Sequence, residues 1–153
     1  MSSFLSTLSP YLPPHEGLLP KWLLFISIIS IGNSIQAYST LQYTSRVYSE
    51  NPSLTPHQST PLAPHSTATP LQGRTFGTWT LIQSLVRLYA AYNISNERFF
   101  ELGFLTYAVA FCHFMAEWMV FRTAKWGGPM AVPVFVSTGT LVWMWLQWGF
   151  YVQ

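Results

Sequence analysis

Residues 21–46 read KWLLFISIISIGNSIQAYSTLQYTSR, and the 24 residues between Lys21 and Arg46 include no charged side chain. The stretch is strongly apolar over its first ten residues and becomes more polar from Gly32 onward. A helix needs about 20 mostly apolar residues to cross about 30 Å of hydrocarbon, since each residue advances it by about 1.5 Å. The sequence therefore predicts a first membrane-spanning helix at about 22–43.

Three further stretches of similar length are almost free of charge. Their only charged residues are Arg87, Glu101 and Glu117. They predict three more spans, at about 76–93, 99–121 and 130–152. The expected fold is an all-α membrane protein, a four-transmembrane-helix bundle that forms a single membrane domain over 1–153.

Composition supports a membrane protein and excludes several other classes. Charged residues make up 8% of the chain, compared with about a quarter in an average soluble domain. The formal net charge is +2 and no run of Lys and Arg occurs, so nucleic acid is not an expected partner. The single cysteine, Cys112, cannot form a disulfide within the chain, and we expect it to act as a small packing residue.

Three short motifs that are typical of enzymes are absent from the sequence. There is no G-x-G-x-x-G, no H-E-x-x-H and no nucleophile elbow. We therefore expect no enzyme activity, no catalytic residues, no cofactor and no metal site.

The connections between the predicted spans differ greatly in length. Residues 49–72 are rich in Pro, Ser and Thr and contain five prolines, which predicts a disordered loop between the first two spans. The other two connections, at 94–98 and 122–129, are short, so the spans they join should be antiparallel neighbours.

Basic residues predict the orientation. Four flank the loops between spans one and two and between spans three and four: Arg46, Arg74, Arg122 and Lys125. The opposite side has only Lys21 and Arg98. Because short cytoplasmic loops carry an excess of Lys and Arg, both larger loops are expected in the cytosol.

Ionisable residues inside a span are costly, so each is a candidate site with a candidate partner. Arg87 lies about 9 Å before the end of the second span, a level close to residue 105 on an antiparallel third span. Glu101 should then lie within reach of its guanidinium. We expect an ion pair that joins these two helices, with contact to a partner protein or a polar lipid head as the alternative.

A second polar group is expected near the cytosolic end of the third span. His113 and Glu117 are four residues apart and therefore share one helix face. Such a pair could shuttle protons in a sterol isomerase, or could simply connect two helices through a polar contact. On the first span, Asn33 and Gln36 are candidates for hydrogen bonds between helices.

Four segments closely resemble ergosterol biosynthetic protein 28 of fungi. They are LPKWLLFISIISIGNSIQAY (19–38), TPLQGRTFGTWTLIQSLVRLYAAYNIS (69–95), HFMAEWMVFRTAK (113–125) and STGTLVWMWLQWGFYVQ (137–153). The resemblance implies a multi-pass protein of the endoplasmic reticulum membrane without catalytic activity. It also implies a scaffold that tethers the sterol C-4 methyl oxidase, the C-3 dehydrogenase/decarboxylase and the 3-ketoreductase, with the sterol C-24 methyltransferase also linked to it.

Three functions remain open at this point. The first is the scaffold. The second is a small membrane enzyme, isomerase-like, that uses His113 and Glu117. The third is a lipid-binding bundle in which Arg87 faces a head group of a membrane lipid. Self-association of the chain is left open as well.

Overall fold

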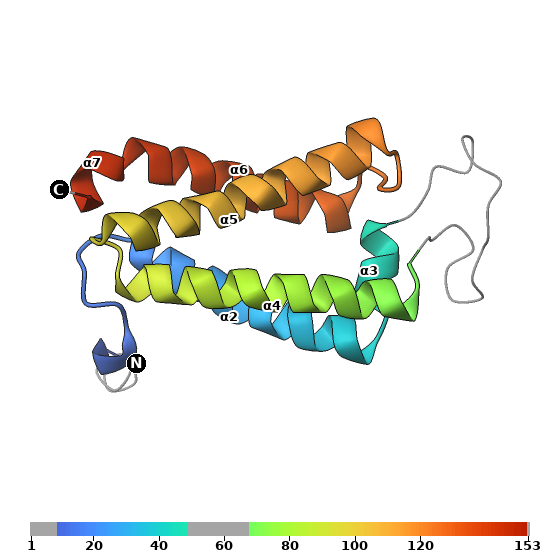
Figure 1. Ribbon diagram of the computed structural model, residues 1–153, viewed down its shortest axis with the longest axis horizontal. Coiled ribbons are helices and arrows are strands. Elements are labelled where there is room, and N and C mark those ends of the chain that lie inside the picture. The colour runs from blue at the N-terminus through green and yellow to red at the C-terminus, as the bar shows by residue number, and fades with distance from the viewer. Residues whose placement is uncertain (1–8, 49–67, 153) are drawn as a thin grey trace.

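Four long helices lie along one another in a computed structural model that describes residues 9–48 and 68–152 (Figure 1). They are α2 (Leu19–Ser39), α4 (Pro70–Tyr92), α5 (Glu97–Met115) and α6 (Gly128–Leu146). Short elements flank them: the 3-10 turn η1 (Ser9–Tyr11), α3 (Gln42–Val47), the π-helical turn η2 (Ala116–Val120) and α7 (Trp148–Tyr151). The all-α prediction is confirmed for the described part of the chain, where no strand occurs.

Three of these helices are long and apolar enough to cross a membrane. They are α2, α6, and α5 continued through η2 to Val120. Helix α4 has 23 residues but is less apolar and is not among them. By length and composition the described residues therefore support three spans, and the predicted fourth span is not confirmed.

The closest contact between helices is the α2–α4 interface, where small residues face each other. Gly73 and Gly77 of α4 lie against the last turns of α2, and Ser34 Oγ donates a hydrogen bond of 2.7 Å to the Gly77 carbonyl. A Cβ atom on Gly77 would lie 2.8 Å from Tyr38 Cδ2 and 3.1 Å from the Ser34 carbonyl oxygen. Glycines four residues apart let two helix backbones approach closely, as in membrane helix dimers.

Two clusters of buried apolar side chains fill the ends of the bundle. Near the chain termini, Leu23, Ala90, Phe100 and Met144 bring all four long helices together. At the opposite end, the buried cluster comes from α3, α5, the following loop and α6: Val47, Tyr48, Phe114, Ala124, Met130 and Val134.

The second long helix begins earlier than predicted. Thr69 and Gln72 form a capping box, in which the Thr69 side chain accepts from the Gln72 backbone N–H and the Gln72 side chain accepts from the Thr69 N–H. Pro70 occupies the first turn, where its missing N–H is not needed. The predicted disordered loop at 49–72 is therefore wrong for Pro70–Gln72, and its part at 49–67 lies outside the described residues.

The ends of the first and fourth predicted spans are also corrected. Helix α2 stops at Ser39 and the chain turns into α3, where Tyr43 donates a 3.3 Å hydrogen bond to the Pro129 carbonyl. That carbonyl is free because Pro133 lies inside α6, four residues later, and has no N–H to donate. Because α6 begins at Gly128, Pro133 lies in its second turn, two residues deeper than a helix start at 130 predicts. At the other end, α6 finishes at Leu146 and α7 follows as a separate turn.

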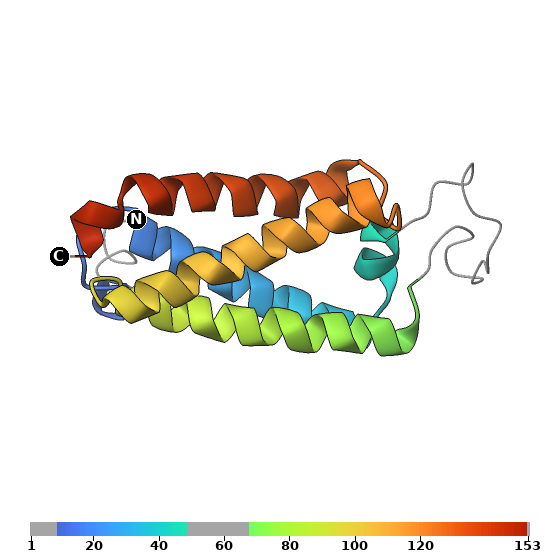
Figure 2. The same ribbon diagram turned by 45° about the horizontal axis from the view of Figure 1, so that its top comes forward.

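Helices α2 and α6 meet only near the α7 end of the bundle. We call the face of the bundle between these two helices the α2–α6 side. Their backbones do not pack along each other as those of α2 and α4 do, and both views show them diverging from the α7 end (Figures 1 and 2). Where they are close, Trp22 Nε1 donates to Thr140 Oγ1 at 2.9 Å, and the rings of Trp22 and Trp143 lie 6.3 Å apart. Helix α3 occupies the opposite end (Figure 2).

Candidate functional site: the polar interior of the bundle

Arg87 of α4 is the only charged side chain that is buried among the described residues, with 7% of its surface exposed. Its Nε donates to Thr106 Oγ1 at 2.9 Å, and its Nη2 donates to Gln83 Oε1 at 2.9 Å and to the Thr106 carbonyl at 3.2 Å. The guanidinium carbon lies 4.0 Å from the centroid of the Tyr107 ring, a cation–π distance. The cation is therefore held by neutral groups, with no carboxylate partner in the described part of the chain.

The predicted ion pair between Arg87 and Glu101 is wrong. Glu101 pairs with Arg98 on its own helix, at 3.0 Å and near the surface. The predicted level was nearly right, since Arg87 reaches Thr106 rather than residue 105. However, Glu101 lies more than one turn nearer the helix end and has its own cation three residues away.

Arg87 lines a cavity of about 270 Å³ that lies among all four long helices and α3. On α2 its wall extends from Trp22 to Asn33, which corresponds to roughly 16 Å along the helix axis. Most of the lining is aromatic and aliphatic. A long apolar cavity with a few fixed polar groups is the usual form of a small-molecule site.

Two hydroxyls in this cavity have no hydrogen-bond partner. They are Thr80 Oγ1 and Tyr107 Oη, both fully buried atoms whose residues line the cavity. Arg87 Nη1 makes no hydrogen bond to any described residue either. Buried polar groups are nearly always hydrogen-bonded in native proteins, so two unpaired hydroxyls on residues that line one cavity, together with an unbonded guanidinium nitrogen, require an explanation.

The cavity reaches the outside between α2 and α6. Among its lining residues, Phe25 of α2 is 54% exposed and Val132 of α6 is 60% exposed. These side chains mark the edges of an opening on the α2–α6 side. The opening lies between two helices that are long and apolar enough to span a membrane.

His113 and Glu117 form a second polar group, as predicted, but it lies outside this cavity. His113 Nε2 is 2.7 Å from the Tyr48 hydroxyl, and its Nδ1 is 3.9 Å from Glu117 Oε1. Burial, and to a smaller extent the charge of Glu117, raises the pKa of Tyr48 well above its usual value. The hydroxyl therefore stays protonated and can donate to the histidine. Glu117 also accepts a hydrogen bond from Thr123 Oγ1.

The two candidates on α2 for hydrogen bonds between helices, Asn33 and Gln36, do not make such bonds to the described residues. Asn33 lies on the cavity wall and Gln36 is exposed, and neither side chain makes a hydrogen bond to another described residue. The hydrogen bonds to α4 come instead from Ser34 and from Tyr38, whose hydroxyl is 2.5 Å from Thr78 Oγ1. Cys112, expected as a packing residue, is exposed on the outer face of α5.

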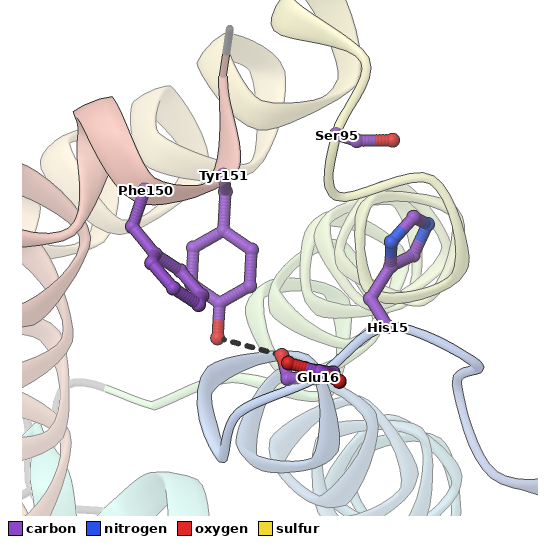
Figure 3. A pocket seen from close by; sticks show the side chains of 5 residues that line it. All are labelled: His15, Glu16, Ser95, Phe150 and Tyr151. Carbon is purple, nitrogen blue, oxygen red and sulfur yellow. Dashed lines mark hydrogen bonds between the residues drawn. The ribbon is translucent and has the colours of Figure 1, made fainter.

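A second hollow, of about 320 Å³, lies at the end of the bundle where α7 meets the segment before α2 (Figure 3). Phe150 and Tyr151 of α7 point toward the segment before α2, and Tyr151 Oη donates to the Glu16 carbonyl at 3.1 Å. His15 lies on the far side of this segment, toward Ser95. The described residues include no group of three potential metal ligands. What the structure shows here is a contact between α7 and the segment before α2.

Fold and interior together define a class: a helical bundle with three helices able to span a membrane, and, among the described residues, one buried cation beside a largely apolar cavity. The comparisons with known proteins give the family. Residues 19–142 match the family described as "Erg28 like protein", and the chain belongs to this family.

The relatives cover most or all of the chain. A Candida albicans protein named "Ergosterol biosynthetic protein 28" is 44% identical over 153 residues, 100% of both chains. A Saccharomyces cerevisiae protein of the same name is 45% identical over 137 residues, 89% of this chain and 84% of the relative. A human protein named "Ergosterol biosynthetic protein 28 homolog" is 30% identical over 130 residues, 84% of this chain and 83% of the relative. No solved structure matches the chain.

Proposed function

We propose that this chain is a non-catalytic scaffold of ergosterol biosynthesis in the endoplasmic reticulum membrane. In this proposal it tethers the sterol C-4 methyl oxidase, the C-3 dehydrogenase/decarboxylase and the 3-ketoreductase, and it also binds the sterol C-24 methyltransferase. The observation that carries the proposal is similarity over the whole length to proteins named for ergosterol biosynthesis. Because the match includes all four long helices, the role of those relatives is transferred to the bundle as a unit.

The proposal includes a multi-pass topology in which α4 crosses the membrane with the other three long helices. Two features support this. Helix α4 packs between α2 and α5, both of which are long and apolar enough to span. Its outward face also carries exposed apolar residues, including Ile82, Leu85 and Tyr89. The loops at 49–67 and 121–127 then share one side, which the basic residues place in the cytosol.

Exposed apolar side chains provide surfaces for several partners at once. Each long helix has large apolar residues that point away from the bundle, for example Ile35 of α2, Val109 of α5 and Phe135 of α6. In a membrane such side chains contact either lipid or the helices of another protein. Holding consecutive enzymes together raises their effective concentration, so an insoluble intermediate can pass to the next enzyme without diffusing away.

Affinity purification tests the scaffold directly. The tagged full-length chain is extracted from endoplasmic reticulum membranes in a mild detergent, and the proteins that co-purify are identified by mass spectrometry. We expect all four enzymes to be recovered well above the level obtained with a tagged, unrelated multi-pass protein of the same membrane. Recovery of none of them above that level would refute the proposal.

The catalytic alternative has no comparable support. His113 and Glu117 are held by Tyr48 and Thr123 and do not line the cavity in which a substrate could bind. The arrangement is consistent with a polar contact that joins α3, α5 and the loop after η2.

A further inference from the structure

The charge of Arg87 has no counter-ion in the described part of the chain. Neutral oxygens hold Nε and Nη2, and Nη1 faces no acceptor. Arg87 is five residues before the end of α4, so it lies about 8 Å along the helix from that end. Cations at such a position in membrane proteins are usually paired and usually mark a functional site.

The cavity beside Arg87 has the form of a lipid site. Its one charged group is the Arg87 guanidinium at the α7 end, and the other polar side chains on its wall, such as Asn33 and Ser137, are neutral. The remaining wall is mainly apolar, with Phe25, Ile29 and Val136 among its residues. A guest that satisfies this cavity has an oxygen acceptor at one end and a hydrocarbon body.

The route into the cavity selects a guest from the membrane. The exposed edge residues Phe25 and Val132 lie on the faces that a bilayer would cover. A volume of about 270 Å³ is small for a lipid site and cannot enclose a two-chain phospholipid with its head group. A lipid with a small head can place that head against Arg87 while part of its body stays between α2 and α6.

We propose that this cavity binds a lipid carboxylate, with Arg87 as the counter-ion. A carboxylate would neutralise the buried charge and accept the free N–H groups of Nη1 in a charge-assisted hydrogen bond. The binding site is distinct from the outward surfaces that the scaffold offers to proteins.

Two sources share this chemistry: a fatty acid and a sterol that carries a carboxyl group. The sterol source rests on the proposed function, because an enzyme that oxidises a methyl group and one that decarboxylates the product must exchange a carboxylic acid. The fatty-acid source does not depend on that function. The experiment therefore has separate arms for the two.

Photo-crosslinking of the purified full-length chain in lipid nanodiscs tests the proposal. Three diazirine probes are compared: a sterol carboxylic acid, a fatty acid, and a neutral sterol with only its hydroxyl. We expect at least one acid probe to label peptides of α2 or α6 at the opening, with labelling competed by the same acid without the diazirine. The neutral sterol should label these peptides about tenfold less, because it has no carboxylate to pair with Arg87.

Variants separate the cavity from the rest of the bundle. Arg87→Gln should reduce acid labelling about tenfold, as the loss of a charge-assisted hydrogen bond predicts. Val132→Trp should block the opening while leaving Arg87 intact, and it should reduce labelling even if Arg87→Gln fails to fold. Arg122→Gln changes an exposed cation outside the cavity and should leave labelling unchanged.

The outcomes decide between the sources and against the proposal. Labelling by the fatty acid alone supports the carboxylate site and excludes the sterol source. Equal labelling by the neutral sterol, insensitive to Arg87→Gln, would overturn the proposal in favour of a neutral lipid. Absence of labelling with all three probes would also overturn it and leave a water-filled cavity. Since no enzyme is present in this assay, its result is independent of the co-purification that tests the scaffold.

Discussion

Helix α2 has two neighbours that it contacts in opposite ways, α4 and α6. Against α4 it presents Ser34, Ala37 and Tyr38 to two glycines, and the backbones come close enough for a side chain to bond to a backbone carbonyl. Against α6 it presents Trp22 at one end and large side chains around a cavity along the rest. One helix thus forms a close contact on the face with small side chains and lines a cavity on the face with large ones.

The largest effect is expected from a change that separates α2 from α4. In Gly77→Ala the new Cβ would lie 2.8 Å from Tyr38 and 3.1 Å from the Ser34 carbonyl oxygen, and the backbone oxygen cannot move aside. We expect the free energy of unfolding to fall by about 2–3 kcal/mol and the amount of protein in the membrane to fall several-fold. Thermal unfolding in detergent and quantitative blotting of membranes measure the two effects.

Gly32→Ala is the matched control, since no other atom lies within 4 Å of the position that its Cβ would take. It should be neutral or slightly stabilising, because Ala is a better helix former than Gly. Equal loss of stability in both variants would show that the α2–α4 interface is not closely packed at Gly77.

The next largest loss of stability is expected where α7 contacts the segment before α2. Gly17 precedes α2 with a backbone φ of +89°, and a Cβ there would lie 2.2 Å from the Tyr151 hydroxyl oxygen of α7. Gly17→Ala should cost about 1–2 kcal/mol in unfolding free energy, because L residues are strained in this conformation. Gly149→Ala, with open space around it on α7, is the control in the same thermal unfolding experiment. An unchanged melting temperature for Gly17→Ala would mean that the two ends of the chain are not in contact.

A smaller effect is expected from the hydrogen bond that joins α2 to α6. Trp22→Phe keeps the aromatic packing and removes the N–H that donates to Thr140 Oγ1. Unfolding free energy should decrease by about 1 kcal/mol, as for an ordinary internal hydrogen bond. Trp145→Phe, on the exposed face of α6, should cost less than half as much. The reverse order would indicate that Trp22 does not hold the two helices together.

The existence of the long helices could be predicted from the sequence, because gaps between charges reflect the thickness of the bilayer. Their ends could not be placed as well, because single residues decide them. The capping box of Thr69 and Gln72 is a readable signal for the start of α4, yet it lies in a segment whose prolines suggest disorder. The glycines at 73 and 77 likewise have the spacing of a close helix contact, and they mark the α2–α4 interface.

The candidate site was predicted only in part, because sequence gives the height of a residue in a bundle better than its direction around the helix. Arg87 was placed close to the right level on α5, but its partner is Thr106 and not Glu101. The cavity itself had no signal in the sequence. It lies where α2 and α6 diverge from the α7 end, and the angle between two helices that are far apart in the sequence cannot be read from either segment alone.

The smallest effect is expected in a double-mutant cycle that tests whether Arg87 interacts with Thr106 rather than with Glu101. Arg87→Leu and Glu101→Leu should change the unfolding free energy additively, with a coupling within about 0.5 kcal/mol of zero, since the two side chains share no contact. Arg87→Leu with Thr106→Val should show clear coupling, because these residues are hydrogen-bonded. A coupling above about 1 kcal/mol between Arg87 and Glu101 would show that the two side chains form an ion pair after all.

The central claim, that the chain acts by holding sterol enzymes together, is tested most directly by replacing it. In cells that lack the chain, the C-4 methyl oxidase is fused through a flexible linker to the C-3 dehydrogenase/decarboxylase, and sterols are measured by mass spectrometry. The fusion is first shown to be active in cells that retain the chain. The account predicts that C-4-methylated sterols accumulate on deletion and fall to nearly the normal level with the fusion, because the linker supplies the effective concentration. Undiminished accumulation with the active fusion would contradict the claim.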